Sequence, residues 1–267
     1  MKIGVFGASG MLGHILVKLS IMSGLNVTPL SRKKMPGDLC EIPVEYFEAS
    51  NYDLKSHDFD YVINCCGLIK QRSTSNSALY EINREFPKRL ASKYGKRLIH
   101  ISTDCVFSGK RGMYVESDEK DAQDNYGLSK SGGEEIDARV LRTSIIGTHA
   151  EDCNGLLEWA RSQRNRSVEG YIDHFWSGVT TLELSKLIID EIENIESQRL
   201  RHVYSNRVSK FDVLNVINDE FDLGMSIKVA SIGLIDRSLS TIFEDNKIRK
   251  NLRNQVQELR DFERIKL

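Results

Sequence analysis

The N-terminus holds the feature that most constrains this chain, a glycine turn between an apolar strand and a helix. Lys2–Phe6 is apolar, Gly7-Ala-Ser-Gly-Met-Leu-Gly13 follows with the spacing G-x-x-G-x-x-G, and Met11–Met22 has helical periodicity. Glycines let the backbone approach a pyrophosphate, and the helix N-terminus attracts its charge. The alternative is an ordinary glycine turn. The pattern predicts a dinucleotide site with cofactor contacts at Gly7, Ser9, Gly10, Met11, Leu12 and Gly13.

Apolar segments alternate with helical patterns over residues 1–147. The predicted strands are Lys2–Phe6, Asn26–Leu30, Glu45–Phe47, Tyr61–Asn64, Arg97–Ser102 and Arg139–Arg142. The predicted helices are Met11–Met22, Ala78–Tyr94 and Tyr126–Ile136. Several strands are continuously apolar, as expected where helices cover both sheet faces. The alternation predicts an α/β fold with a Rossmann-type, doubly wound parallel sheet.

The pattern changes after Gly147. Helices are predicted at Leu156–Arg164, Thr181–Glu196 and Lys210–Phe221, while the tail from Asp245 is charged and shows little apolar periodicity. We therefore expect residues 148–267 to form a smaller, mostly helical substrate-binding lobe, some of whose strands can return to the main sheet.

Composition narrows the classes of partner. The chain has 37 Lys and Arg against 38 Asp and Glu, a formal net charge of −1. This balance argues against nucleic acid or an anionic membrane as a partner. No apolar run is long enough to cross a bilayer, and no signal peptide is visible. Five unclustered cysteines predict reduced thiols, a cytoplasmic protein and no metal site.

The end of the second predicted strand bears on cofactor choice. A site that prefers NAD usually has an acidic residue there, which binds the ribose 2′-hydroxyl. This chain has Ser31 and Arg32 instead. A hydroxyl and a guanidinium suit the 2′-phosphate of NADPH. We predict NADPH, with NADH as the alternative cofactor. A solvated basic turn is the structural alternative.

Two further strand ends complete the predicted cofactor site. Glu48 follows the third strand and is placed either to accept a hydrogen bond from the adenine amino group or to lie on the surface. Cys66 and Gly67 follow the fourth strand. Gly67 would let the backbone pass close to the cofactor, and a tight turn is the alternative interpretation.

The predicted catalytic residues lie farther along the chain. Tyr126 and Lys130 are four residues apart, so they share one helix face. The lysine charge can lower the pKa of the phenol and make it a proton donor or acceptor. Ser102 and Thr103 end the fifth strand, where a hydroxyl faces the ligand crevice and can polarise a substrate oxygen. We assign this role to Thr103.

These segments resemble the dTDP-4-dehydrorhamnose reductase branch of the extended short-chain dehydrogenases/reductases. The resemblance rests on Gly7–Gly13, Ile101–Phe107 and Tyr126–Lys130, and it extends to Leu141–Ser144, Gly178–Leu182 and Asp236–Leu239. It implies NADPH-dependent reduction of the 4-keto group of a nucleotide-linked 4-keto-6-deoxy sugar, in deoxysugar synthesis for surface polysaccharide. Thr103, Tyr126 and Lys130 would form the catalytic set. A homodimer is an open expectation.

The resemblance also implies substrate contacts and a supporting residue. Asn83 would hold a water near the lysine, and Arg142 or Arg237 would contact the diphosphate, although both arginines could instead be structural. The full set of implied substrate contacts is Val106, Arg142, Trp176 and Arg237. The chain departs from the branch at Cys105, where tyrosine is frequent, and in lacking a proline near Gly178–Thr180.

Two rival functions remain at this stage. An epimerase or 4,6-dehydratase would keep a resident NAD, but a dehydratase tends to have two acids after the strand-end threonine, and here Cys105 follows Asp104. A regulatory subunit that binds NADP without turnover is the other rival. The intact Tyr126 and Lys130 argue against it.

Overall fold

The computed structural model describes residues 1–267 except 71–72, 74, 149–154, 194–197 and 244–247. A seven-stranded sheet is its centre, with the order β11-β6-β5-β4-β1-β2-β3. All neighbouring strands in this sheet are parallel. The strands are β1 (Lys2–Phe6), β2 (Asn26–Ser31), β3 (Glu45–Tyr46), β4 (Tyr61–Asn64), β5 (Leu98–Thr103), β6 (Arg139–Thr143) and β11 (Leu200–His202). The predicted doubly wound parallel sheet is confirmed.

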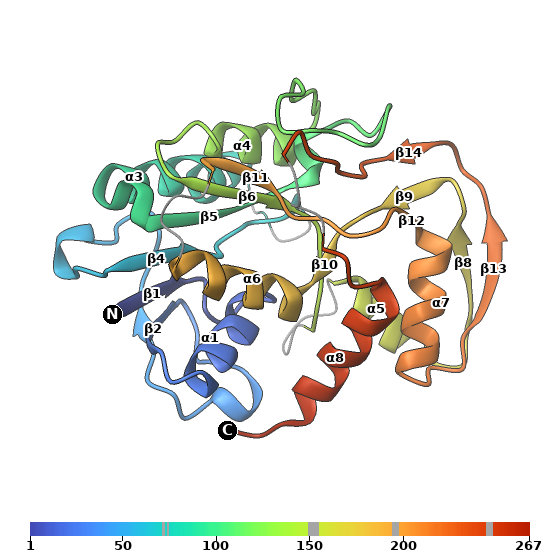
Figure 1. Ribbon diagram of the computed structural model, residues 1–267, viewed down its shortest axis with the longest axis horizontal. Helices are drawn as coiled ribbons and strands as arrows, with labels where there is room; N and C mark the ends of the chain where they lie inside the picture. Colours follow the sequence, from blue (N-terminus) through green and yellow to red (C-terminus); the bar gives the residue numbers. More distant parts are fainter. Residues whose placement is uncertain (71–72, 74, 149–154, 194–197, 244–247) are drawn as a thin grey trace.

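Helices cover both faces of this sheet (Figure 1). One face carries α1 (Gly13–Met22) and α6 (Thr181–Glu193), and the other carries α2 (Asn76–Tyr80), α3 (Phe86–Tyr94) and α4 (Asn125–Gly133). A π-helical segment, η4 (Glu81–Glu85), joins α2 to α3, so the single helix predicted there is interrupted. Short 3₁₀ turns lie at η1 (Gly37–Leu39), η2 (Leu54–Ser56), η5 (Gly95–Arg97) and η6 (Asp104–Val106).

The buried core explains why β1 is apolar throughout. Side chains alternate across a strand, so Val5 packs in the cluster with α1 and α6, while Phe6 packs on the opposite face. The rings of Phe6 and Phe86 are 5.5 Å apart between centroids, and Phe47 lies 5.2 Å from Phe6. Each such buried ring contributes about 1.5–3 kcal/mol. This aromatic cluster fixes α3 against the sheet.

The second lobe mixes helices with small sheets, on the right in Figure 1. Its helices are α5 (Leu156–Ser162), α7 (Lys210–Glu220) and α8 (Leu252–Arg264). β8 (Ser167–Tyr171) pairs with β13 (Ser226–Ala230), and β9 (His174–Trp176) lies between β12 (Val208–Ser209) and β14 (Ile235–Asp236). β7 (Ile145–Ile146) pairs with β10 (Val179–Thr180). These strands were not predicted. After Gly147 the chain enters this lobe and returns to the first for α6 and β11, as the sheet order shows.

Helix α8 corrects the prediction for the C-terminal tail. Its buried apolar residues are Leu252, Val256, Leu259 and Phe262, which pack in the core of the second lobe. These positions recur at helical spacing, but the charged residues between them conceal the pattern. The prediction of little periodicity after Asp245 was wrong.

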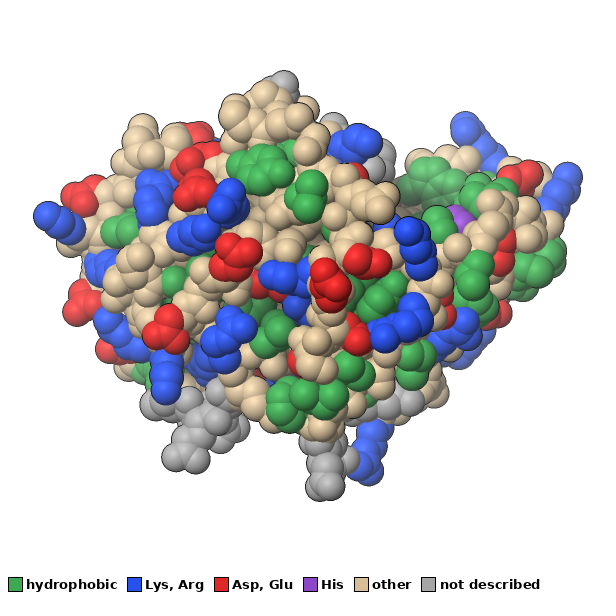
Figure 2. Space-filling model, turned by 90° about the horizontal axis from the view of Figure 1, so that it is seen from above, with side chains coloured by type: hydrophobic (Ala, Val, Ile, Leu, Met, Phe, Trp, Pro, Cys, Tyr) green, Lys and Arg blue, Asp and Glu red, His purple; other side chains and the backbone are tan. Residues whose placement is uncertain are grey.

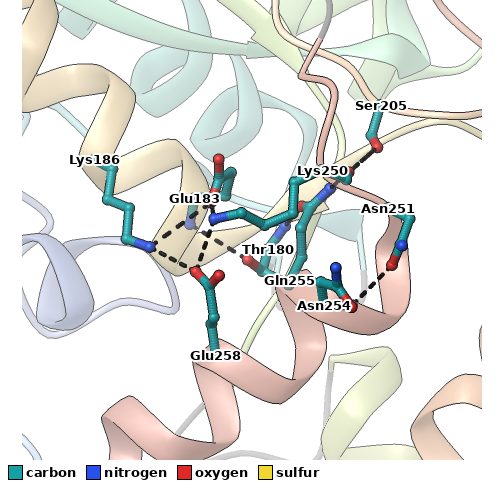
Figure 3. A network of polar contacts seen from close by, with 9 residues as sticks. All are labelled: Thr180, Glu183, Lys186, Ser205, Lys250, Asn251, Asn254, Gln255 and Glu258. Atoms are coloured by element: carbon teal, nitrogen blue, oxygen red, sulfur yellow. Dashed lines mark hydrogen bonds and ion pairs between the residues drawn. The ribbon is translucent and has the colours of Figure 1, made fainter.

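Polar contacts fix the start of α8 to α6 and β10 (Figure 3). Lys250 Nζ lies 3.1 Å from Glu183 Oε2 and 2.8 Å from Glu258 Oε2. Gln255 is buried, accepts a hydrogen bond from Thr180 N at 3.1 Å and donates one to Ser205 Oγ at 3.0 Å. The carbonyl and the NH₂ group of the buried Gln255 amide both have hydrogen-bond partners. Gln255 can therefore set the position of α8 with little cost from burying a polar group.

Acidic and basic side chains are interspersed over the face shown in Figure 2. No broad basic area is seen from that side, in keeping with the net charge of −1. None of the helices in the described residues is long and apolar enough to cross a membrane.

Candidate active site

The glycine turn packs tightly between β1, α1 and the end of β4. Gly7 has a φ of +77°, a conformation that other residues rarely adopt, and a Cβ there would lie 2.9 Å from Cys66 N. A Cβ at Gly13 would lie 2.2 Å from Gly7 O. Both positions therefore require glycine, and the helix begins directly on the turn.

Only part of the predicted turn lines a cavity. Gly7, Ser9 and Gly10 face it. Leu12 is 4% exposed and belongs to the core below α1, so only its backbone can contact a ligand. Met11 is half-buried, with its methyl end beside Gly155.

The end of β2 meets the turn at the same cavity. Ser9 Oγ and Ser31 Oγ are 2.6 Å apart, and Ser31 Oγ also accepts a hydrogen bond from Lys33 N at 3.2 Å. Arg32 is exposed at the cavity and forms no ion pair within the described residues. An open guanidinium beside two hydroxyls is the chemistry that binds a phosphate monoester.

The other walls of the cavity come from the ends of β3 and β4. Glu48 is exposed there, and Cys66 and Gly67 line the same cavity. Burial raises the pKa of the Cys66 thiol to about 12, so the wall is neutral at this point. A Cβ at Gly67 would meet no atom within 4 Å, so Gly67 faces open space. The cavity has a volume of about 740 Å³, and its size and lining fit an adenosine dinucleotide.

The turn after β5 presents the predicted hydroxyl. Thr103 Oγ1 accepts a hydrogen bond from Cys105 N at 3.2 Å and donates one to Asp104 Oδ1 at 3.2 Å. Ser102 Oγ instead donates to Glu134 Oε1 at 2.5 Å in the protein interior. Because the Ser102 hydroxyl already donates to the buried Glu134, the Thr103 hydroxyl is the better placed of the two to contact a substrate oxygen.

Helix α4 lies directly on the β5 turn. The Asp124 side chain caps it by accepting from Gly127 N at 2.7 Å. A Cβ at Gly127 would lie 2.5 Å from Cys105 O, so glycine permits the close approach. The Tyr126 side chain is close enough to the β5 turn for Thr103 to lower and Cys105 to raise the pKa of its phenol.

Lys130 is buried and faces the sheet. Its Nζ donates to Ile101 O at 2.7 Å. Burial lowers the pKa of Lys130 to about 8, while the acidic groups of Glu134, Cys66 and Cys65 act in the opposite direction. We predicted that Lys130 would lower the pKa of Tyr126. The structure shows the opposite shift: burial raises the pKa of Tyr126, and the hydrogen bond with Thr103 only partly offsets this.

The π-helical segment holds the site together through Asn83. Its side chain accepts from Leu68 N at 2.8 Å and donates to Leu68 O at 2.9 Å and to Ser129 Oγ at 3.0 Å. Asn83 thereby ties the strand end after Gly67 to helix α4. The water that the resemblance implies at Asn83 stays a prediction.

Three of the four implied substrate contacts lie in cores. Val106 is fully buried, and Trp176 is 3% exposed with its indole N–H bonded to Ser144 Oγ. Arg142 is 1% exposed, paired with Glu134 at 2.6 Å and bonded to His202 Nε2 at 2.8 Å. The prediction that Arg142 contacts substrate is therefore corrected, because its guanidinium is already satisfied inside the protein.

Arg237 is the implied contact that reaches the site. It is half-buried, its Nε donates to Phe107 O at 2.9 Å, and it interacts electrostatically with Asp104. Sequence reasoning missed Lys210, the first residue of α7, which also acts on Asp104. The only signal for Lys210 was a lysine at a predicted helix start.

The parallel sheet, the glycine turn after β1 and the cavity at the strand ends define a Rossmann-type α/β protein. Residues 1–230 match the model of the RmlD substrate binding domain family. The chain belongs to this family.

Curated relatives agree with this assignment. The chain is 30% identical over 178 residues to the probable low-salt glycan biosynthesis reductase Agl14 of Haloferax volcanii, covering 59% of each protein. It is 29% identical over 163 residues to the dTDP-4-dehydrorhamnose reductase of Mycobacterium tuberculosis, covering 55% of this chain and 51% of that protein. The matches thus span between half and three fifths of these relatives.

A solved structure shows the same fold. The dTDP-4-dehydrorhamnose reductase of Bacillus anthracis, solved in complex with NADP, superposes with a TM-score of 0.76 at 19% identity. The superposition covers 96% of this chain and 97% of that protein.

Proposed function

We propose that this protein reduces the 4-keto group of a nucleotide-linked 4-keto-6-deoxy sugar, using NADPH. The observation that carries the proposal is the assembly of Thr103, Tyr126 and Lys130 at the end of β5, next to a cavity that has Arg32 at its edge. The names of the relatives support the reaction, and the NADP complex of the related structure supports the cofactor.

The residues of the site have separate roles in the proposed reaction. NADPH, when bound, supplies the hydride for the carbonyl carbon. Thr103 orients the carbonyl oxygen and polarises it when its hydroxyl hydrogen turns from Asp104 Oδ1 to that oxygen. Tyr126 donates a proton to that oxygen as the alcohol forms. The raised pKa of Tyr126 keeps the phenol protonated before the reaction, which suits an acid.

Lys130 supports this chemistry as a cation. Its buried ammonium lies beside the wall formed by Cys65 and Cys66, where the nicotinamide ribose would bind. The pKa of about 8 means that the charge is lost as the pH rises through that value. We therefore expect the rate of reduction to fall above about pH 8.

The cofactor end of the cavity supports NADPH over NADH. Ser9, Ser31 and Arg32 present two hydroxyls and an open guanidinium to the cavity, whose lining also includes the carboxylates of Glu48 and Glu81. NADH remains the alternative cofactor. The four described cysteines are free thiols. Free thiols and NADPH both suit a reducing compartment, so the cytoplasm is the proposed location. A homodimer is a further expectation, to be tested by light scattering.

The test is NADPH oxidation by the purified protein with a panel of 4-keto-6-deoxy sugar nucleotides that differ in base. The proposal predicts turnover with at least one of them. Product that forms without loss of NADPH would favour an epimerase or dehydratase. NADPH that binds but is never oxidised across the panel would favour a regulatory subunit.

A further inference from the structure

Helix α4 carries the proposed proton donor, and two further side chains on it bind the end of β5. Lys130 Nζ donates a hydrogen bond to Ile101 O at 2.7 Å. Glu134, the residue that caps the end of the helix, accepts one from Ser102 Oγ at 2.5 Å. Lys130 and Glu134 are four residues apart and so share one helix face. Together they fasten α4 to two successive residues of β5, directly before Thr103.

A buried ion pair fixes the position of the Glu134 carboxylate. Arg142 of β6 donates to both of its oxygens, from Nε at 2.9 Å and from Nη2 at 2.6 Å, and both residues are buried. Lys120 Nζ lies 3.6 Å from the same carboxylate. Burial alone would raise the pKa of this carboxyl, but Arg142, Ser102 and Lys120 together lower it, so it is ionised. Such a bidentate pair leaves the carboxylate little freedom to move.

Arg142 is anchored in turn on its other sides. Its guanidinium lies 4.9 Å from the centre of the Phe107 ring, directly after the β5 turn. Its Nη1 lies 2.8 Å from His202 Nε2, and His202 Nδ1 lies 2.7 Å from Ser240 O. Because a carbonyl can only accept, Nδ1 carries the hydrogen and the neutral imidazole accepts from Arg142. The ion pair therefore joins the end of α4 to β5, β6 and β11.

Glu134 is also the ionised acidic group beside Lys130. Burial lowers the pKa of Lys130 to about 8, and Glu134 is the strongest of the acidic groups that oppose this. The other two, Cys66 and Cys65, are thiols whose pKa is raised by burial, so both are neutral near pH 7. Burial also lowers the pKa of His100, which faces Lys130 from β5, well below its usual range. The imidazole is therefore neutral as well.

We infer that Glu134 is a positioning residue for the proposed reduction. Through Ser102 it holds the end of β5 against α4, and its negative charge stabilises the ammonium of Lys130. The inference rests on the proposed function, because it concerns the residues assigned to that reaction. A buried ion pair often stabilises a protein no more than well-packed apolar residues would. Stability alone therefore does not account for a charged pair at this place.

A double-mutant cycle tests the link to β5. Ser102→Ala and Glu134→Gln, singly and together, are assayed for reduction of a 4-keto-6-deoxy sugar nucleotide at pH 7. Ser102→Ala removes one hydrogen bond and keeps the ion pair, so it should lower kcat about 10-fold. Glu134→Gln should lower kcat about 100-fold, the scale of a 1 Å displacement of catalytic groups. The double variant should be no slower than Glu134→Gln, because Ser102 acts through Glu134.

The pH profile tests the charge. In wild type, kcat should fall above about pH 8 as Lys130 loses its proton. Without the negative charge the ammonium is less stable, so in Glu134→Gln this fall should begin at a lower pH. Glu134→Asp keeps the charge but is one methylene shorter. It should have a reduced kcat and a fall at the same pH as wild type, and so should Ser102→Ala.

The matched control is Glu135→Gln, which removes the neighbouring exposed carboxylate. Its kcat and its pH profile should both equal those of wild type. Glu134→Gln leaves the buried Arg142 without its counter-ion and could fail to fold. In that event Ser102→Ala and Glu134→Asp still test the link to β5, because each keeps a negative charge beside Arg142.

The outcomes separate the inference from the proposed function. If the Glu134 variants lose stability but keep the kcat and the pH profile of wild type, the ion pair is purely structural and the inference is overturned, while the proposed function stands. Additive losses in the double variant would also overturn it, because Ser102 would then act independently of Glu134. If wild type reduces no 4-keto sugar nucleotide, the proposed function falls and the inference falls with it.

Discussion

The cofactor cavity and the junction between the lobes are assembled from the chain in different ways. The cavity is lined by backbone and short side chains at consecutive strand ends, such as Gly7, Ser31 and Gly67. The junction gathers side chains from distant segments: Arg237 donates to the carbonyl of Phe107, 130 positions earlier in the sequence. The first kind of site follows from local backbone requirements. The second depends on how the lobes pack.

This difference has a physical basis. A glycine turn specifies its own geometry, because Gly7 needs a positive φ and Gly13 leaves no room for a Cβ. A substrate contact needs only a polar side chain at the right place, and many packings of the second lobe could supply one. The two regions can therefore be tested separately, by substitutions at the cavity and the β5 turn and by substitutions in the second lobe.

The first prediction concerns the proton donor. Tyr126→Phe removes only the hydroxyl, so it should lower the rate of 4-keto reduction about 10²- to 10⁴-fold, the usual scale for general acid catalysis. NADPH binding, measured by fluorescence titration, should be unchanged. Tyr46→Phe, at an exposed tyrosine, is the control and should be fully active. Wild-type turnover in Tyr126→Phe would remove this residue from the mechanism.

The second prediction concerns the helix that sequence reasoning missed. Leu259 is fully buried in the core of the second lobe, so Leu259→Ala should lower the free energy of unfolding by about 2–5 kcal/mol. Gln257→Ala, on the exposed face of α8, should change it little. Urea denaturation measures both. Equal stabilities would mean that α8 does not pack as the structure shows.

The third prediction concerns the charge of Lys130. Its folded pKa is about 8 against an ordinary 10.5, so between these values the unfolded chain binds more protons than the folded one. Stability from this group therefore rises with pH across the interval, by roughly 3 kcal/mol. Wild type should gain stability relative to Lys130→Met from pH 8 to 10.5. A constant difference between the two proteins would show that the pKa of Lys130 is not lowered.

The fourth prediction concerns the cofactor's 2′-phosphate. Arg32→Ala removes one charged contact and should weaken NADPH binding by about 1–3 kcal/mol while leaving NADH affinity unchanged. Lys34→Ala removes a nearby exposed charge that does not line the cavity, and should have little effect. Calorimetric titration of both cofactors checks this. Equal losses of affinity for NADPH and NADH would show that Arg32 does not contact the 2′-phosphate.

Much of the first lobe could be predicted from the sequence. The predicted strands of the main sheet match the observed ones to within a residue or two, because continuous apolar runs leave few alternatives when helices cover both faces. The interruption of the helix at Glu81–Glu85 could not be predicted. Within this segment Asn83 bonds to Leu68 and Ser129, and only the folded chain brings these groups together.

The second lobe shows where sequence reasoning loses its basis. Arg142 looks like an anion contact in the sequence, but its environment includes His202, 60 positions later. Lys210 looked unremarkable, and only the approach of α7 to the β5 turn gives it a partner in Asp104. The C-terminal helix was predictable in principle, since Leu252, Val256, Leu259 and Phe262 follow helical spacing.

The most direct test of the proposed function follows the hydride. NADPH deuterated at the transferring C4 position is consumed by the protein with a 4-keto-6-deoxy sugar nucleotide, and the product is analysed by mass spectrometry and NMR. The account predicts one deuterium at sugar C4 for each NADPH oxidised, and no tightly held NAD in the purified protein. Product without deuterium, formed with no net loss of NADPH, would contradict it.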